Sequence, residues 1–102
     1  MGGDYEEELD SRFGTMMHVD FQTIGPEVIG YSVVLVVAVA GRIETIRVYD
    51  SAHGFNEMHR YRQGLGKSSG KRFHSGTLGK GMRSAIEDIK QGHEAMVEGW
   101  KG

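Results

Sequence analysis

Hydrophobic and polar residues alternate along the first half of the chain in the way that predicts β-strands. Residues 16–23 have one apolar and one polar face, and residues 31–40 (YSVVLVVAVA) are apolar on both. A strand without a polar face is typical of the centre of a sheet, where a helix covers one side and another layer covers the other. Alternation resumes over 43–49 and 55–62, and a short edge strand is expected at 71–74.

The last quarter of the chain changes to the spacing of an amphipathic helix. From Leu78 to Trp100 apolar residues recur at steps of three and four, which places them on one stripe. Ser75 or Thr77 would serve as the N-cap. The pattern predicts an α+β fold in which an antiparallel β-meander of four to five strands packs against one long C-terminal helix.

The length of 102 residues predicts a single domain over residues 1–102. Residues 1–14 combine glycines with five acids, and two interpretations of this segment stay open. The spacing of Tyr5, Leu9 and Phe13 suits a short helix, whereas a flexible acidic tail is the alternative. In a third arrangement, the acids would lie against the basic stretch 58–86.

Composition excludes several classes of function. The chain has no cysteine, which rules out disulfides, thiolate metal sites and cysteine nucleophiles, and agrees with a cytoplasmic location. No signal peptide is visible. The longest apolar run, Val33–Ala40, is far shorter than the roughly 20 residues that span a bilayer, so no membrane association is expected.

Charge is distributed unevenly along the chain. Residues 1–50 carry nine acids and three bases, whereas residues 51–102 carry nine bases and five acids. Between Met58 and Ile86 there are seven lysines and arginines and no acid. Such a run is typical of a solvated face, and it is also what an RNA-binding surface requires.

Residues 46–62 hold the candidate chemistry. Two histidines can act as general base and general acid near neutral pH, and a tyrosine can position a substrate, so the candidate catalytic residues are His53, His59 and Tyr49. Arginines can bind a phosphate bidentately, and the candidate substrate-binding residues are Arg47, Asp50, Arg60 and Arg62. These groups would suffice for metal-independent cleavage of RNA through its 2′-hydroxyl, and equally for RNA binding alone.

Two other motifs give weaker support for a function. Gly64–Ser69 contains G-K-S but lacks the spacing and the following helix of a phosphate-binding loop. Metal ligands could come from His53, His59, His74, Asp50 and Glu57. Their spacing matches no compact pattern, however, and neighbouring cations oppose a divalent ion, so we predict no metal and no cofactor.

The segment RVYDSAHGFNEMHRY (47–61), followed by MRSAIEDIK (82–90), resembles a family of small prokaryotic domains of unknown function. Members share an R-Y-D-x-A-H-G hairpin, a histidine-containing strand and a C-terminal A-I-x-D-I helix. The hairpin is also similar, at fewer positions, to toxins of toxin–antitoxin pairs. Val48 is inserted between Arg47 and Tyr49, and Met58 stands where a second histidine would be expected. The family resemblance implies a fold and no established activity.

Two functions remain in view. The first is a non-catalytic interaction module that binds a small protein partner or forms a homodimer through the helix and the edge strand, with an exposed methionine or Trp100 at the helix end as the anchor. The alternative is an RNA-binding protein, or a metal-independent ribonuclease of toxin type, that uses the 47–62 hairpin. The sequence leaves open whether the protein is an enzyme.

Overall fold

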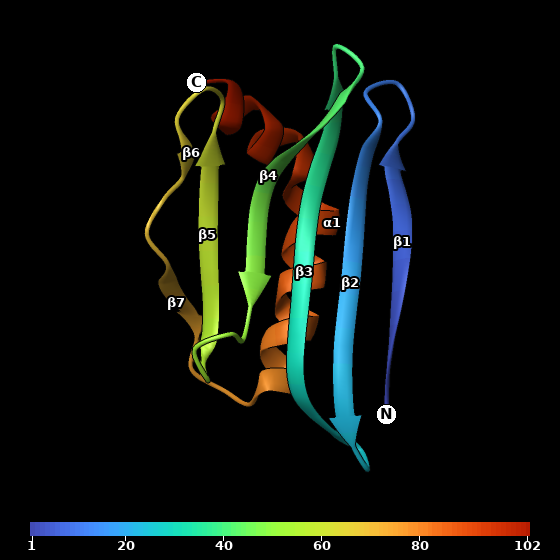
Figure 1. Cartoon of the computed structure of the whole chain (residues 1–102), viewed down its shortest axis with the longest axis vertical. Coiled ribbons are helices and arrows are strands. Elements are labelled where there is room, and N and C mark those ends of the chain that lie inside the picture. Colours follow the sequence, from blue (N-terminus) through green and yellow to red (C-terminus); the bar gives the residue numbers. More distant parts are fainter.

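Seven strands follow one another along the chain in the computed structural model, which describes residues 1–102. They are β1 (Gly2–Asp10), β2 (Thr15–Ile24), β3 (Glu27–Val39), β4 (Arg42–Asp50), β5 (Asn56–Arg62), β6 (Gly66–Lys67) and β7 (Lys71–His74). Neighbouring strands from β1 to β5 pair antiparallel, and both β6 and β7 pair with the outer edge of β5. The helix α1 (Leu78–Lys101) lies behind this sheet (Figure 1). The predicted α+β meander with one C-terminal helix is confirmed, with more strands than expected.

The core lies between α1 and one face of the sheet. The buried apolar residues are Met17, Val19, Tyr31, Val33, Leu35, Val37, Ile46, Tyr49, Ala85, Ile89 and Trp100. Thr77 is the N-cap, because its hydroxyl accepts a hydrogen bond from the Lys80 amide at 3.2 Å. Only α1 backs the sheet, so its amphipathic stripe and the inward residues of three strands together make the core.

A bulge in β4 changes the alternation that the sequence predicts. Arg47 pairs with Leu35 and Thr45 pairs with Val36, which leaves Ile46 as the extra residue. Ile46 and Tyr49 are therefore both buried, although a regular strand would place them on opposite faces.

The acidic N-terminal segment is a strand, which differs from both the expected short helix and the expected flexible tail. β1 pairs with β2 over most of its length and forms one edge of the sheet. Its acids do not lie against the basic stretch 58–86. Instead, Glu7 forms an ion pair with Lys90 of α1 at 3.3 Å.

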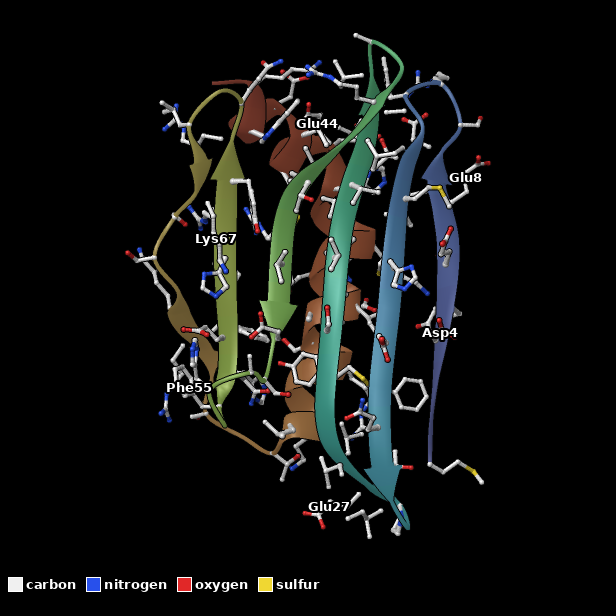
Figure 2. The ribbon with its side chains drawn as sticks, in the orientation of Figure 1. Asp4, Glu8, Glu27, Glu44, Phe55 and Lys67 are labelled. Atoms are coloured by element: carbon white, nitrogen blue, oxygen red, sulfur yellow. The ribbon has the colours of Figure 1, made fainter.

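The face of the sheet turned away from α1 has no covering layer, and the side chains of Asp4, Glu8 and Lys67 stand on it (Figure 2). We refer to it as the open face. Val34, Val36 and Val48 on this face are only half-buried. The expectation of cover on both sides of the central strand was therefore wrong. α1 is not apolar enough over a sufficient length to cross a membrane.

Candidate functional site

The register of the β4–β5 hairpin decides where its polar residues lie. Arg47 pairs with Arg60, and Tyr49 pairs with Met58. Because directly paired residues share a face and Tyr49 is in the core, this group lies on the helix side of the sheet. The intervening pairs, Asp50 with Glu57 and Val48 with His59, lie on the open face. The structure thus divides the candidate residues of the 46–62 segment between two sites, one on each face of the sheet.

The helix side of the hairpin contains a cavity of about 380 Å³ between β5 and the end of α1. Its cationic wall consists of Arg47, Arg60, Arg62 and Lys71. Three of the four expected substrate-binding residues therefore meet in one place. The fourth, Asp50, is on the open face.

The cavity has positive charge without compensating carboxylates. No aspartate or glutamate lines it. Four of the twelve lysines and arginines of the chain, Arg12, Arg42, Lys90 and Lys101, each form an ion pair with a carboxylate. The remaining eight, all between residues 47 and 83, form none. The cavity therefore keeps a positive charge that no carboxylate in its wall neutralises.

Arg47 is the most constrained of these cations. Its Nε is buried and has no hydrogen-bond partner. Its Nη1 donates to the Tyr49 hydroxyl at 3.3 Å. A buried donor without a partner costs roughly 1–3 kcal/mol, more when charged. This cost would be removed by an anion entering the cavity.

Tyr49, one of the expected catalytic residues, is 2 % exposed and packs edge-on against Phe73, with ring centroids 4.9 Å apart. Burial raises the pKa of the Tyr49 hydroxyl, and the hydrogen bond from Arg47 offsets part of that rise. Tyr49 therefore orients Arg47 rather than contacting a ligand. Trp100 is also buried, at 4 % exposure, so it is not the exposed anchor that was one of the two expected at the helix end.

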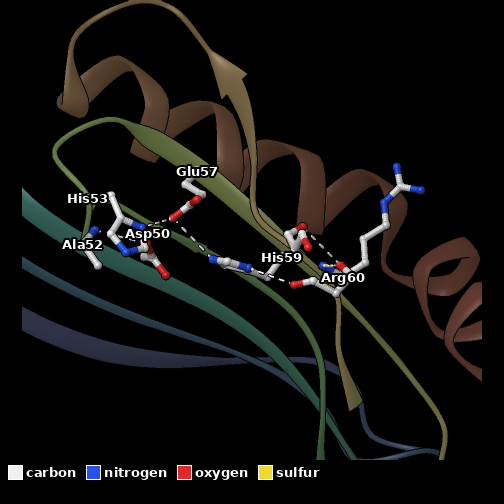
Figure 3. Close-up of polar contacts among 8 residues, drawn as sticks. Asp50, Ala52, His53, Glu57, His59 and Arg60 are labelled. Carbon is white, nitrogen blue, oxygen red and sulfur yellow. Dashed lines mark hydrogen bonds and ion pairs between the residues drawn. The ribbon is translucent and has the colours of Figure 1, made fainter. Parts of the chain in front are cut away.

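The open face brings together the two expected catalytic histidines around a carboxylate (Figure 3). His53 Nδ1 lies 2.7 Å from Glu57 Oε1, and His59 Nε2 lies 3.4 Å from the same oxygen. Hydrogen bonding by His53 lowers the pKa of Glu57, and the charges of both histidines add to this effect. Glu57 is therefore the centre of the cluster.

Burial differs sharply within this cluster. Glu57 and His59 are 7 % and 6 % exposed, whereas the His53 side chain is 67 % exposed. Gly70 packs over the buried pair, and a Cβ at this glycine would collide with both side chains. The segment between β6 and β7 thus covers the cluster from the sheet edge.

Only weak signals for these two sites are present in the sequence. Asp50, Glu57 and His59 follow no recognisable spacing, because hairpin pairing brings them together. Their nearest ligand atoms all lie within 4.8 Å of one another. His74, which was grouped with them as a ligand, accepts a hydrogen bond from the Gly76 amide and is not one of these three residues.

Sequence reasoning also missed Asn56, which is 1 % exposed. Its Oδ1 accepts a hydrogen bond from the Tyr31 hydroxyl at 2.7 Å. Its Nδ2 donates to the carbonyls of His74, Gly76 and Thr77. Asn56 therefore fixes the loop that leads into α1.

No family model, curated protein or solved structure matches this chain. Its function is therefore argued from the geometry of the two sides of the β4–β5 hairpin.

Proposed function

We propose that the protein binds single-stranded RNA through the cationic cavity on the helix side of the β4–β5 hairpin. The observation that carries this proposal is the grouping of Arg47, Arg60, Arg62 and Lys71 around one cavity without any carboxylate. Guanidinium groups bind phosphate in bidentate geometry, and RNA is a partner that presents phosphates in series.

The surroundings of the cavity suit a nucleic acid better than a lone phosphate. Tyr61 lines the cavity and is half-buried, so its ring can stack on a base. Lys67 and Arg72 are unpaired cations of the same edge of the sheet, although their side chains stand on the open face and do not line the cavity. They add to the positive potential around this edge, which attracts a polyanion.

Binding without cleavage is the form of the proposal that the geometry favours. The histidines expected to exchange protons lie on the open face, while the arginines expected to hold phosphate lie on the helix side. A general base has to lie within hydrogen-bond reach of the proton that it removes. His53 and His59 do not face a phosphate held in the cavity.

The test is fluorescence anisotropy with a labelled single-stranded RNA. We expect the double variant Arg60→Gln and Arg62→Gln to bind at least about tenfold more weakly and to show a salt slope shallower by about 0.7 per cation removed. The matched control is Arg12→Gln and Arg42→Gln, since both arginines already have carboxylate partners. Equal losses in the two double variants, or unchanged affinity in the first, would contradict the proposal.

A second candidate is self-association through the open face, favoured by its uncovered valines and its division of charge. The β1 edge carries Asp4 and Glu8, and the opposite edge carries Lys67 (Figure 2). A two-fold axis parallel to the strands would place the acidic edge of one copy over the basic edge of the other.

Light scattering during gel filtration tests this second candidate. We expect a dimer that Val34→Lys dissociates, whereas Leu65→Lys, at an exposed position in the turn between β5 and β6, leaves it intact. A monomer at every soluble concentration would contradict it.

A further inference from the structure

Three potential ligands converge on the open face of the β4–β5 hairpin. The ligand atoms of Asp50, Glu57 and His59 lie within 4.8 Å of one another. Ligand atoms bound at about 2.0–2.2 Å from a tetrahedral zinc ion are about 3.3–3.6 Å apart. Small side-chain adjustments would therefore bring the three groups to coordination distance.

Each of these side chains is held by a second group that leaves a ligand atom free. The Ala52 amide donates to Asp50 Oδ1 at 3.1 Å, and His53 Nδ1 lies 2.7 Å from Glu57 Oε1. The Ser68 carbonyl lies 3.2 Å from His59 Nδ1. A carbonyl can only accept, so Nδ1 carries the proton and Nε2 faces the carboxylates. Metal-binding histidines are commonly oriented in this way, by a hydrogen bond from the ring nitrogen that does not bind the metal.

The cluster lacks a lysine or arginine partner. Neither Asp50 nor Glu57 forms an ion pair with any lysine or arginine. Arg72 is paired with Glu57 in the register of β7, but its guanidinium lies over the Phe55 ring, 4.8 Å from the centroid. Glu57 is buried beside His59. A positive ion shared by the three groups would stabilise them, because two carboxylates and an imidazole nitrogen face one another where little solvent reaches them.

We infer that Asp50, Glu57 and His59 form a binding site for one divalent first-row transition ion of the Zn²⁺ class. One imidazole nitrogen with two carboxylates favours such an ion over Mg²⁺ or Ca²⁺, which prefer oxygen ligands alone. His53 remains outside the coordination sphere and orients Glu57. The fourth position is left to water, as in sites where three protein ligands hold a zinc ion.

This site is independent of the proposed RNA cavity. Its ligands project from the open face, and the arginines of the cavity project to the helix side. The expectation of no metal rested on the lack of a compact ligand spacing and on cations adjacent in sequence. Hairpin pairing brings the three ligands together, and strand alternation turns Arg60 away from His59. Loss of metal binding and loss of RNA binding are thus expected from different substitutions.

The test is calorimetric titration of the whole chain with Zn²⁺ alone, after treatment with a chelator. We expect one equivalent to bind and the melting temperature to rise with Zn²⁺ concentration. Asp50→Asn and His59→Gln should each weaken binding at least about tenfold. The matched control is His18→Gln, because His18 also lies on the open face beside a carboxylate, 3.3 Å from Glu6.

A second measurement covers the case in which a ligand variant fails to fold. In the unaltered chain, Co²⁺ should give the absorption bands of a site with mixed nitrogen and oxygen ligands, and Zn²⁺ should shift the NMR signals of the His59 ring more than those of His18. The inference is overturned if binding survives both ligand substitutions, if His18→Gln abolishes it, or if Zn²⁺ leaves the His59 signals unchanged.

Discussion

The two sides of the β4–β5 hairpin differ in how their charge is balanced. On the helix side, Arg47, Arg60 and Arg62 surround a cavity with no carboxylate in its wall. On the open face, Glu57 lies between two imidazoles and next to Asp50. The first side lacks anions and the second lacks a strong cation, although a single layer of backbone separates them.

Strand alternation explains this separation. Arg60 follows His59 directly in sequence, yet the two side chains project to opposite faces (Figure 3). A short polar hairpin can therefore carry two sites of opposite charge. Each of the following predictions alters one of these two sides.

The largest effect is expected where a glycine permits close packing. A Cβ at Gly81 would collide with the side chain of Asn56, which four hydrogen bonds hold in place. We expect Gly81→Ala to lower the free energy of unfolding by about 2 kcal/mol, despite a gain of roughly 1 kcal/mol in helix propensity. Urea denaturation measures this change.

The matched variant on the open face is Gly70→Ala. Its Cβ would meet Glu57 and His59, but the loop between β6 and β7 is exposed and can move outward. We expect Gly70→Ala to lower the free energy of unfolding by about 1 kcal/mol or less. A larger loss at Gly70 than at Gly81 would show that the open face, and not the helix contact, limits stability.

Replacing the buried cation of the cavity should stabilise the unliganded protein. Arg47→Met keeps most of the apolar stem and removes an Nε that has no partner. Because the buried Tyr49 hydroxyl loses its hydrogen-bond partner as well, we expect a net gain of no more than about 1 kcal/mol in urea denaturation, together with weaker RNA binding. Arg12→Met, at an exposed ion pair, should change stability by less than about 0.5 kcal/mol. A loss of stability in Arg47→Met would mean that the cavity already satisfies this arginine.

Alkaline pH should lower the free energy of unfolding, because the buried hydroxyl of Tyr31 on the helix side holds its proton more tightly in the folded protein than in the unfolded chain. Burial raises the pKa of the Tyr31 hydroxyl, and the negative charge of Asp50 adds to the rise. The unfolded chain therefore loses this proton first, and stability falls as pH rises above about 10. We expect Tyr31→Phe to be less stable than the unaltered protein at neutral pH, because Asn56 loses a hydrogen-bond donor. Between pH 9 and 11, however, its stability should fall less than that of the unaltered protein. Parallel curves for the two proteins would contradict this assignment.

The smallest effect is expected from the exposed histidine. His53→Ala removes the hydrogen bond to Glu57 on the open face and touches nothing in the cavity. RNA affinity measured by anisotropy should stay within experimental error of the unaltered protein. A clear loss would mean that bound RNA reaches both faces around the sheet edge, and would revive a catalytic role for this residue.

Local periodicity was enough to predict the α+β fold. The stripe from Leu78 to Trp100 gave the helix, and the valine-rich stretch 31–40 gave the central strand. The acidic segment 2–10 was not recognised as a strand, because glycine, aspartate and glutamate are poor strand formers. Pairing with β2 outweighs that preference.

The candidate site was harder to predict, because the face of the sheet on which each side chain lies depends on pairing between residues that are distant in the sequence. The alternation of β5 correctly separated His59 from Arg60. The sequence did not show that Arg47 pairs with Arg60, or that a bulge at Ile46 brings Ile46 and Tyr49 into the same core. Asn56 looked like an ordinary polar residue, since its partners are carbonyls some twenty positions away.

The strand β1 has one further consequence, for how copies of this protein can meet. A sheet with an unpaired border can recruit another strand and grow into a fibre. Here the free border belongs to a strand with three consecutive glutamates, so two such borders repel one another. Two short, interrupted strands occupy the opposite border. Lateral polymerisation is thus disfavoured at both ends, which leaves stacking of whole sheets as the available mode of assembly.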